Sequence, residues 1–317
     1  MTRRLLSAGE VVVDLVLTVP GLPRRGGDVL ARTATTLAGG AFNVMAAASR
    51  QGVAVTYAGL LGTGPMADLA AAALAAAQID VALPARTDRD TGTVVALVEP
   101  DGERTFVTTL GAEAGLTDED LAAVAIRADD VVHISGYGLA YPANGRCLAR
   151  WVRSLPGTVT VVLDPGPLVG QVPPAVLDPV LRRTDWLSCT DGEARVLADD
   201  GHDPRASAAV LRERVRCGVV VRRGRRGAVV AAYDDEPVIV PALTVDVVDL
   251  NGAGDAHVGS LIASLATDGD GFRPAAAVHR ANGAAALAVT RRGPATAPTR
   301  EQLDMFMAST GRGAPIG

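Results

Sequence analysis

The sequence contains no lysine, and all 30 residues counted as lysine plus arginine are arginine. This absence excludes three kinds of active site that depend on a lysine amine. They are the phosphate-binding P-loop, which ends in Gly-Lys-Ser/Thr, the Lys–Glu pair of protein kinases, and a Schiff base with pyridoxal phosphate. If the chain binds phosphate groups, it must use backbone amides, arginine side chains or a metal ion.

Cysteine and excess charge are also scarce. The 3 cysteines have no metal-ligand spacing, and a sparse, odd set is typical of reduced thiols in a cytoplasm. A net charge of −5 gives no general attraction to nucleic acid or to an anionic membrane surface. We therefore expect a cytoplasmic protein without a nucleic-acid partner.

Long apolar runs are missing as well. No segment reaches the roughly 20 consecutive apolar residues that span a bilayer. The first apolar stretch follows two arginines, but Glu10 and Asp14 interrupt it, so it does not fit a signal peptide. We expect no membrane partner.

Apolar, β-branched runs alternate with Ala/Leu-rich stretches along most of the 317 residues. This alternation predicts an α/β fold in one large domain, residues 1–317, with a mostly parallel central sheet and helices on both faces. The predicted strands are Val11 to Val13, Val53 to Leu61, Val131 to Ser135, Val159 to Leu163, Trp186 to Ser188 and Val219 to Val221. The predicted helices are Met66 to Ala77, Asp118 to Ile126, Cys147 to Ser154, Glu193 to Ala198, Ala206 to Val215, Ala253 to Ala266, Pro274 to Val289 and Arg300 to Met307.

Two stretches interrupt this alternation. Residues 14–37 contain two prolines and a Gly-Gly pair before a strand-like pattern, and residues 91–110 fit two strands around a Pro-Asp-Gly turn. Together they predict a small antiparallel sheet inserted into the core. The alternative is a surface hairpin without a role at the site.

The most informative segment is Asp249 to Asp255, which reads Asp-Leu-Asn-Gly-Ala-Gly-Asp and runs directly into a helical stretch. The Gly252-Ala253-Gly254 turn lets the backbone approach a ligand closely, and the helix that it opens directs unpaired N–H groups at one point. That point suits a phosphate. Asp255 cannot serve to bind the phosphate, because like charges repel, so it is better interpreted as a base for an attacking hydroxyl.

These residues carry a resemblance to a known family. The turn resembles the C-terminal signature of the ribokinase-like (PfkB-type) carbohydrate kinases, and the segment Gly39 to Ala46, running into Arg50-Gln51-Gly52, resembles their N-terminal signature. The two signatures stand in the family's order, and the resemblance covers nearly the whole chain. It implies a ribokinase-like three-layer fold, the small sheet as a lid over the sugar, and a homodimer formed through the lid.

The resemblance also implies roles at the site. Asp255 would be the catalytic base, with the amides of Gly252, Ala253 and Gly254 as the anion hole of an ATP-dependent sugar kinase. Sugar hydroxyls would be held by Asp14, which follows the first predicted strand, and by Gly39, Gly40 and Asn43. The nucleotide would lie near Gly224, Asn251 and Asn282.

Metal ions enter through the same resemblance. Glu193 matches the family residue that organises Mg²⁺ through water, although Thr190 and Glu193 also fit a helix capping box. The family's monovalent-cation loop, which would hold K⁺, maps onto Asp249, Asn251, Ala288, Arg291 and Gly293.

Other functions remain open. A nucleoside-type kinase of the same fold would use the same residues on a ribosyl compound. The Gly62-Thr63-Gly64-Pro65-Met66-Ala67 run imitates a dinucleotide fingerprint and keeps an NAD-dependent dehydrogenase as an alternative, although the acidic residue expected at the end of the next strand is missing. A non-catalytic sugar-binding protein is the third alternative. The chain also resembles an uncharacterised subgroup of bacterial sugar kinases that has a histidine two residues after the base, which is His257 here.

Overall fold

The computed structural model describes residues 3–199 and 203–310, and within these ranges nine strands form the central sheet. Every neighbouring pair is parallel except the two at one edge, which join β11 to β12 and β12 to β13. In spatial order the strands are β13 (Val238–Val240), β12 (Ala228–Ala232), β11 (Gly218–Arg222), β10 (Trp186–Thr190), β9 (Thr160–Asp164), β8 (Val131–Ser135), β1 (Leu5–Ser7), β4 (Val55–Tyr57) and β5 (Ile79–Val81).

The period of two along each strand divides the core into two clusters. In β9, Val161 and Leu163 belong to one cluster and Val162 to the other, as expected for side chains that alternate across a sheet. The first cluster is covered by α3 (Asp118–Ala123), α5 (Pro142–Ser154), α6 (Pro174–Arg183), α7 (Asp191–Ala198) and α8 (Pro204–Arg212). The second is covered by α1 (Ala41–Arg50), α2 (Pro65–Ala76), α9 (Ala253–Thr267) and α10 (Pro274–Ala288), with α11 (Arg300–Thr310) packed on α10.

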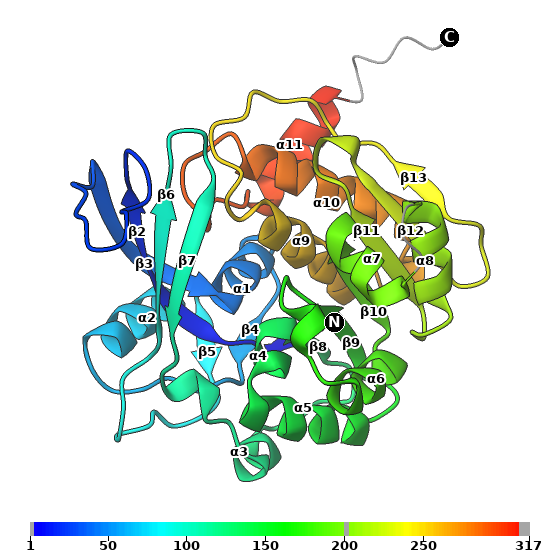
Figure 1. Cartoon of the computed structure of the whole chain (residues 1–317). Coiled ribbons are helices and arrows are strands. Elements are labelled where there is room, and N and C mark those ends of the chain that lie inside the picture. The colour runs from blue at the N-terminus through cyan, green and yellow to red at the C-terminus, as the bar shows by residue number, and fades with distance from the viewer. Residues whose placement is uncertain (1–2, 200–202, 311–317) are drawn as a thin grey trace.

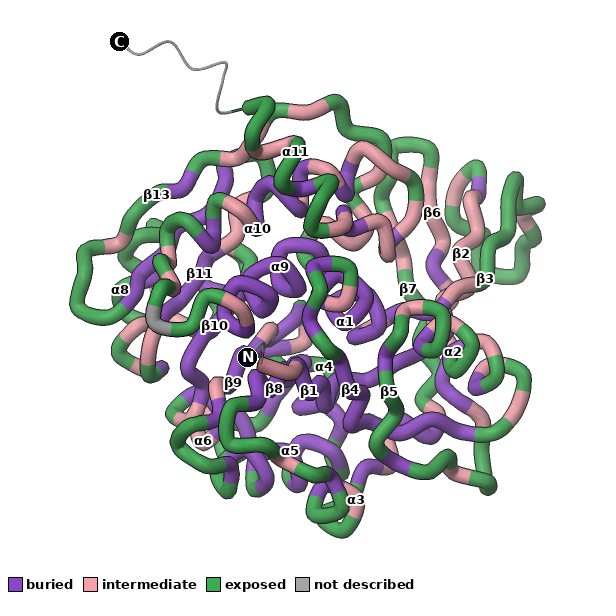
Figure 2. Tube along the Cα trace, turned by 180° about the vertical axis from the view of Figure 1, so that it is seen from behind, coloured by how far each residue is buried: buried purple, intermediate pink, exposed green. Residues whose placement is uncertain are grey.

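Helices on both faces of a mostly parallel sheet confirm the predicted fold class (Figure 1). Helix α9 is buried without interruption from Ala256 to Ala266, and in Figure 2 its tube is purple for most of its length. Gly259 of α9 lies against α1, where a larger side chain would collide with Ala47. This close approach brings the first turn of α9 next to the start of α1, which is where the site forms.

Four strands make a second, smaller sheet beside the central one, in the order β3 (Thr33–Gly40), β2 (Val11–Thr18), β6 (Thr93–Val98) and β7 (Arg104–Thr109). The predicted ranges 14–37 and 91–110 overlap these strands. The small sheet is mixed rather than purely antiparallel, because β2 and β6 run parallel.

The N-terminal strand assignment was wrong. Val11 to Val13 open β2 of the small sheet, and the first strand of the central sheet is the shorter β1. Asp14 therefore lies inside β2 and does not follow the first core strand. The apolar run hid this change of sheet, because β1 and the start of β2 are both buried and only three residues separate the two strands.

Several further boundaries moved or were missed. The predicted strand Val53 to Leu61 keeps only β4, while α6 and the edge strands β12 and β13 had no sequence assignment. Helix α1 and strand β5 were also absent from the predicted lists. The other predicted strands and helices lie where they were expected, with ends shifted by a few residues, and α4 (Gly136–Ala140) lies just before α5. Within the described ranges, no helix combines the length and the apolar character that a bilayer crossing requires.

Candidate active site

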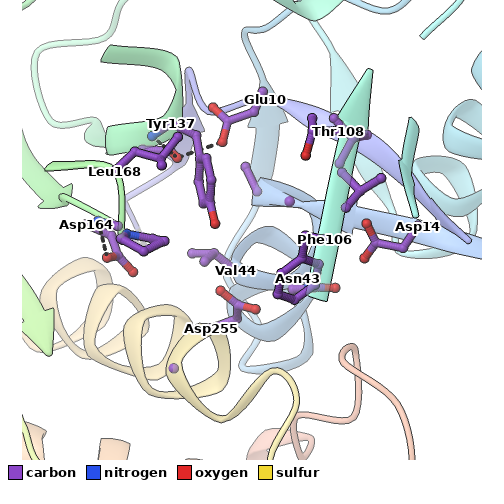
Figure 3. Close-up of a pocket in the computed structure, with 18 of the residues that line it drawn as sticks. Glu10, Asp14, Asn43, Val44, Phe106, Thr108, Tyr137, Asp164, Leu168 and Asp255 are labelled. Carbon is purple, nitrogen blue, oxygen red and sulfur yellow. Dashed lines mark hydrogen bonds between the residues drawn. The ribbon is translucent and has the colours of Figure 1, made fainter. Parts of the chain in front are cut away.

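A cavity of about 580 Å³ lies between the small sheet and the ends of the parallel strands. It is lined by the last residues of three parallel strands of the central sheet, Ser135 of β8, Asp164 of β9 and Arg222 of β11, as expected for the carboxyl edge of a parallel sheet. The small sheet supplies the opposite wall with Val12, Asp14, Val94, Phe106 and Thr108. Figure 3 shows side chains from both walls pointing into this space.

Asp255 lies in the first turn of α9 and lines the cavity. The turn before it requires Gly252, which has φ 75° and whose Cβ, if present, would collide with the Pro294 carbonyl. Burial raises the pKa of Asp255 to about 6; the nearby Asp164 raises it further, while Arg222 and the Asn43 side chain oppose the shift. A carboxylate with that pKa is ionised at neutral pH and remains basic enough to accept a proton.

Three of the four predicted sugar-binding residues line the same cavity, and Gly39 does not. Asp14, Gly40 and Asn43 line it, and no donor from the described part of the chain reaches the Asp14 carboxylate. Burial raises the pKa of Asp14 to about 6. Gly39 is paired with Val12 across the strands, and a methyl group on it would overlap the Asp14 carboxylate, so Gly39 makes room for that side chain.

Asn43 occupies the first turn of α1 and is buried. Its Oδ1 has no hydrogen-bond partner among the described residues. A buried amide oxygen without a donor is costly, so a ligand hydroxyl is the natural partner for it.

Sequence reasoning missed Glu10. It is 5% exposed and lines the cavity between β1 and β2. Its Oε1 accepts from the Ser135 hydroxyl at 2.8 Å, whereas its Oε2 has no partner within the described chain. Burial raises its pKa to about 7. The available signal was a carboxylate within an apolar run. Because burying a carboxylate is costly, such a residue indicates a buried group with a specific partner or a functional role.

Tyr137 and Phe106 were missed as well. Both lie on the cavity wall with 40% and 60% of their surface exposed, Tyr137 on α4 and Phe106 on β7. The chain has only 4 phenylalanines and 4 tyrosines, and three of these eight residues line this one cavity, with Tyr141 as the third. In Figure 3 the Tyr137 ring extends between Glu10 and Asp255.

The capping-box interpretation of Thr190 and Glu193 is borne out by the geometry. The Thr190 hydroxyl accepts from the Glu193 N–H at 3.3 Å, and the Thr190 N–H donates to Glu193 Oε2 at 2.7 Å. Glu193 nevertheless lines the cavity and lies 3.8 Å from Arg222. The two roles are compatible, because a bidentate carboxylate retains lone pairs after capping the helix.

All three residues expected near the nucleotide, Gly224, Asn251 and Asn282, lie outside the cavity lining. Gly224 follows β11 with φ 56° and has open space around its Cα. Asn282 is buried in α10, where its Nδ2 donates to the carbonyls of Val240 and Pro241 at 3.2 and 3.0 Å. His257 is buried in α9, and neither of its ring nitrogens finds a partner in the described ranges.

The predicted monovalent-cation residues are brought together by Asp249. Its Oδ1 accepts from the Asn251 N–H at 2.9 Å, and its Oδ2 accepts from the Gly293 N–H at 3.0 Å. Arg104 of the lid strand β7 also donates to Asp249 Oδ1 at 2.7 Å, so an ion pair links the lid to this loop. Ala288 O and Gly293 O both accept from the Thr296 hydroxyl, and Arg291 donates to Thr296 O.

The dinucleotide-like run at Gly62 to Ala67 has another use. The N–H groups of Met66 and Ala67 at the start of α2 donate to the Asp90 carboxylate at 3.1 and 2.8 Å. The amides that a pyrophosphate would need are therefore taken by a carboxylate, and the charge there repels a phosphate. This geometry argues against the dehydrogenase alternative.

A basic carboxylate set in an anion-binding turn, opposite a second carboxylate under a lid, defines a class of protein. It is an α/β phosphotransferase for a small alcohol. A family model described as pfkB family carbohydrate kinase matches residues 2–301. The chain belongs to this family, and it is therefore a sugar kinase.

Individual relatives agree with this assignment. The chain is 32% identical over 305 residues to an uncharacterized sugar kinase, YegV, of Escherichia coli K12, which covers 95% of this chain and 93% of the relative. It is 31% identical over 306 residues to an ATP-dependent ribose-1-phosphate kinase of Halopiger xanaduensis, covering 96% and 98% of the two chains. The crystal structure of a putative ribokinase II from E. coli in complex with ATP and Mg²⁺ aligns with a TM-score of 0.80 at 24% identity, covering 97% of this chain and 99% of that one. The ribokinase-like fold is thereby confirmed.

Proposed function

We propose that the protein transfers the γ-phosphoryl group of ATP to a primary hydroxyl of an uncharged sugar bound in the 580 Å³ cavity. The observation that carries the proposal is the convergence of Asp255, Asp14 and Asn43 on that cavity from α9, β2 and α1. Asp14 and Asn43 offer acceptors to sugar hydroxyls, and Asp255 takes the proton of the attacking hydroxyl as the new O–P bond forms. The Gly252–Gly254 turn holds the phosphoryl oxygens on backbone amides.

ATP and Mg²⁺ fit the residues on the donor side. The anion turn at the start of α9 supplies amides for the phosphates, and the Asp164 and Glu193 carboxylates stand at the same edge of the cavity. Within the described ranges no group of three or more His, Cys, Asp or Glu residues could hold a metal. This suits Mg²⁺, which binds mainly through phosphates and water with one or two carboxylates and supplies charge neutralisation there.

The charge of the cavity argues for an uncharged acceptor. Among the described lining residues, Glu10, Asp14, Asp164, Glu193 and Asp255 are acidic, and Arg222 on the donor side is the sole arginine. Burial lowers the pKa of His133, the remaining ionisable base, to about 4, so it is neutral at physiological pH. An anionic acceptor would meet like charges without a counter-ion on the lid side.

A panel assay for ADP release tests the proposal. We expect turnover with neutral sugars such as ribose or fructose and none above background with ribose 1-phosphate or aldonic acids. Nucleosides belong on the panel because the half-exposed Tyr137 and Phe106 rings could stack on a heterocyclic base, which makes a nucleoside-type kinase the second candidate. Turnover of ribose 1-phosphate at the rate of neutral sugars would contradict the argument from the charge of the cavity. If no acceptor led to ADP release, the kinase proposal would be contradicted.

The loop joined by Asp249 remains a candidate K⁺ site, with carbonyls of Asn251, Ala288, Arg291 and Gly293 as ligands. The support is that Ala288 O and Gly293 O converge on one hydroxyl of Thr296. The same assay in potassium and in choline buffer tests it. Equal rates in the two buffers would leave the loop a purely structural role.

The lid predicts a homodimer. By the pleat of the small sheet, Leu15, Leu17, Val95, Leu97 and Val107 lie on the face opposite Asp14 and Thr108, and all five are partly or fully exposed. A twofold pairing of two lids would cover this apolar face. We expect a dimer by analytical ultracentrifugation, and Val95→Asp together with Leu97→Asp should give a monomer. A wild-type monomer across micromolar concentrations would contradict the prediction.

A further inference from the structure

Arg222 is a buried cation on the wall of an otherwise acidic cavity. It ends β11, and its side chain is 11% exposed. Among the described lining residues, five carboxylates surround the cavity and this guanidinium supplies the single fixed positive charge. A buried charge is costly unless it is paired, so the position of Arg222 calls for an explanation.

The contacts of Arg222 explain part of that cost. Nη1 and Nη2 donate to the two oxygens of Asp164, each at 3.2 Å, and Nη2 lies 3.8 Å from Glu193 Oε2. Burial alone would lower the pKa of Arg222, but Asp164 and Glu193 more than offset burial and hold the pKa above its ordinary value. The guanidinium is therefore charged at every physiological pH and is held in a fixed orientation by a bidentate partner.

The remaining contact places Arg222 at the anion turn. Nη1 also donates to Gly254 O at 3.3 Å, so the guanidinium lies against the residue that precedes Asp255. Its Nε has no partner within the described chain. Apart from its bond to Asp164, Nη2 lies 3.8 Å from Glu193 Oε2, which is too far for a normal hydrogen bond. The guanidinium thus keeps unused donor capacity and lies beside the turn where phosphoryl oxygens would bind.

We propose that Arg222 is a catalytic residue that stabilises the charge of the phosphoryl group during transfer, by giving up part of its pairing with Asp164 for the phosphoryl oxygens. This inference rests on the proposed function. In the step, the acceptor oxygen forms a bond to the γ-phosphorus, and the bond from that phosphorus to the β–γ bridging oxygen breaks. The acceptor proton passes to Asp255, and ADP leaves with the electron pair. Charge spreads over the equatorial oxygens in the transition state, where a fixed arginine has its largest effect.

Loss of Arg222 should impair the chemical step more than nucleotide binding. Arg222→Met removes the charge, and we expect kcat to fall by about 10²–10³, the effect of removing one such donor elsewhere. The affinity for ADP with aluminium fluoride and Mg²⁺, measured by calorimetry, should fall by a similar factor. The affinity for ADP alone should change by about threefold or less, because ADP lacks the group that the guanidinium contacts. Arg222→Lys restores a charge without the planar fork and should recover part of the loss.

Two controls distinguish a catalytic role of Arg222 from a purely structural one. Arg225→Met alters an exposed neighbour on the turn after β11 and should leave all three measurements at the wild-type values. If Arg222→Met fails to fold because Asp164 is left unpaired, the Arg222→Met/Asp164→Asn double variant removes both buried charges and provides the measurement. Wild-type kcat and fluoride affinity in either variant would overturn the proposal and leave Arg222 as a structural brace. If the wild-type protein released no ADP with any acceptor on the panel, the proposed function would be overturned instead. The calorimetric comparison of the variants distinguishes this failure from a failure of the Arg222 proposal.

Discussion

Replacing Asp255 by asparagine is expected to abolish most turnover while nucleotide binding persists. Asparagine preserves the size of the side chain and the turn at the start of α9, but it cannot accept the proton of the attacking hydroxyl. General-base assistance typically contributes about 10²–10⁴ in rate, so kcat should fall within that range. The amides of Gly252 to Gly254 are unchanged, and the removed charge only repelled phosphate, so the Kd for ATP measured by calorimetry should stay the same or decrease.

The pH dependence gives an independent test of the same residue. The base must be ionised, and the pKa of Asp255 is raised to about 6, so wild-type kcat should rise as pH increases through about 6 and then level off. The variant should lack this dependence. Because the pKa of Asp255 is higher in the folded state, the wild-type free energy of unfolding should fall as pH rises from the ordinary pKa of 3.8 to about 6. Asp255→Asn has no titrating carboxyl at this position, so its free energy of unfolding should fall less over the same range.

Asp268→Asn is a matched control, because Asp268 is an exposed carboxylate at the other end of the same helix. It should leave kcat and its pH profile unaltered. Turnover of Asp255→Asn within a few-fold of wild type would remove Asp255 from the mechanism. Loss of ATP binding together with turnover would show that the carboxylate maintains the turn rather than acting as a base.

The second large effect is expected at Asp14. Its carboxylate faces the cavity without a donor from the residues that the structure describes, and two sugar hydroxyls can supply the missing bonds. Charge-assisted hydrogen bonds contribute about 1.5–3 kcal/mol each, so Asp14→Ala should raise the KM for the sugar roughly tenfold or more. The KM for ATP should be nearly unchanged, because the proposed site of the donor phosphates is at the opposite, α9 side of the cavity.

Gly39→Ala provides a second route to the same effect, because the added methyl would overlap the Asp14 carboxylate and displace it without removing it. Asp28→Ala, on the exposed segment between β2 and β3, is the matched control and should bind sugar normally. An unchanged sugar KM in folded Asp14→Ala would exclude the role of this residue in substrate binding.

The fold and the central motif could be predicted because their signals are local. The period of two in strands such as β9 and the Gly-Ala-Gly turn before α9 each depend on a few adjacent residues. The conformation of the turn requires glycine at position 252, because φ is positive there and a Cβ would collide with the Pro294 carbonyl. Asp255 was predicted from this local turn and Asn43 from the family resemblance, and the structure brings both residues to one cavity.

The features that were missed depend on contacts far apart in sequence. Glu10 and Ser135 are separated by 125 residues, and the parallel pairing of β1 with β8 brings the segment after β1, which carries Glu10, to the end of β8. The Arg222–Asp164 pair spans 58 residues in the same way. An arginine after a strand is usually solvated, so nothing in the local pattern distinguished Arg222 from Arg225 until burial and partners were known.

Phosphorus-31 NMR of a reaction mixture tests the central claim most directly. With ATP, Mg²⁺ and the best acceptor from the panel, wild-type protein should convert ATP to ADP and produce one phosphomonoester resonance. Its proton-coupled signal should be a triplet, because a phosphate on a primary carbon couples to two methylene protons. Asp255→Asn should produce this signal at the greatly reduced rate expected above. A doublet would mark a phosphate on a secondary carbon and would contradict the assignment of the cavity as a primary-hydroxyl sugar kinase site. The assignment would also be contradicted if wild-type protein consumed no ATP with any acceptor.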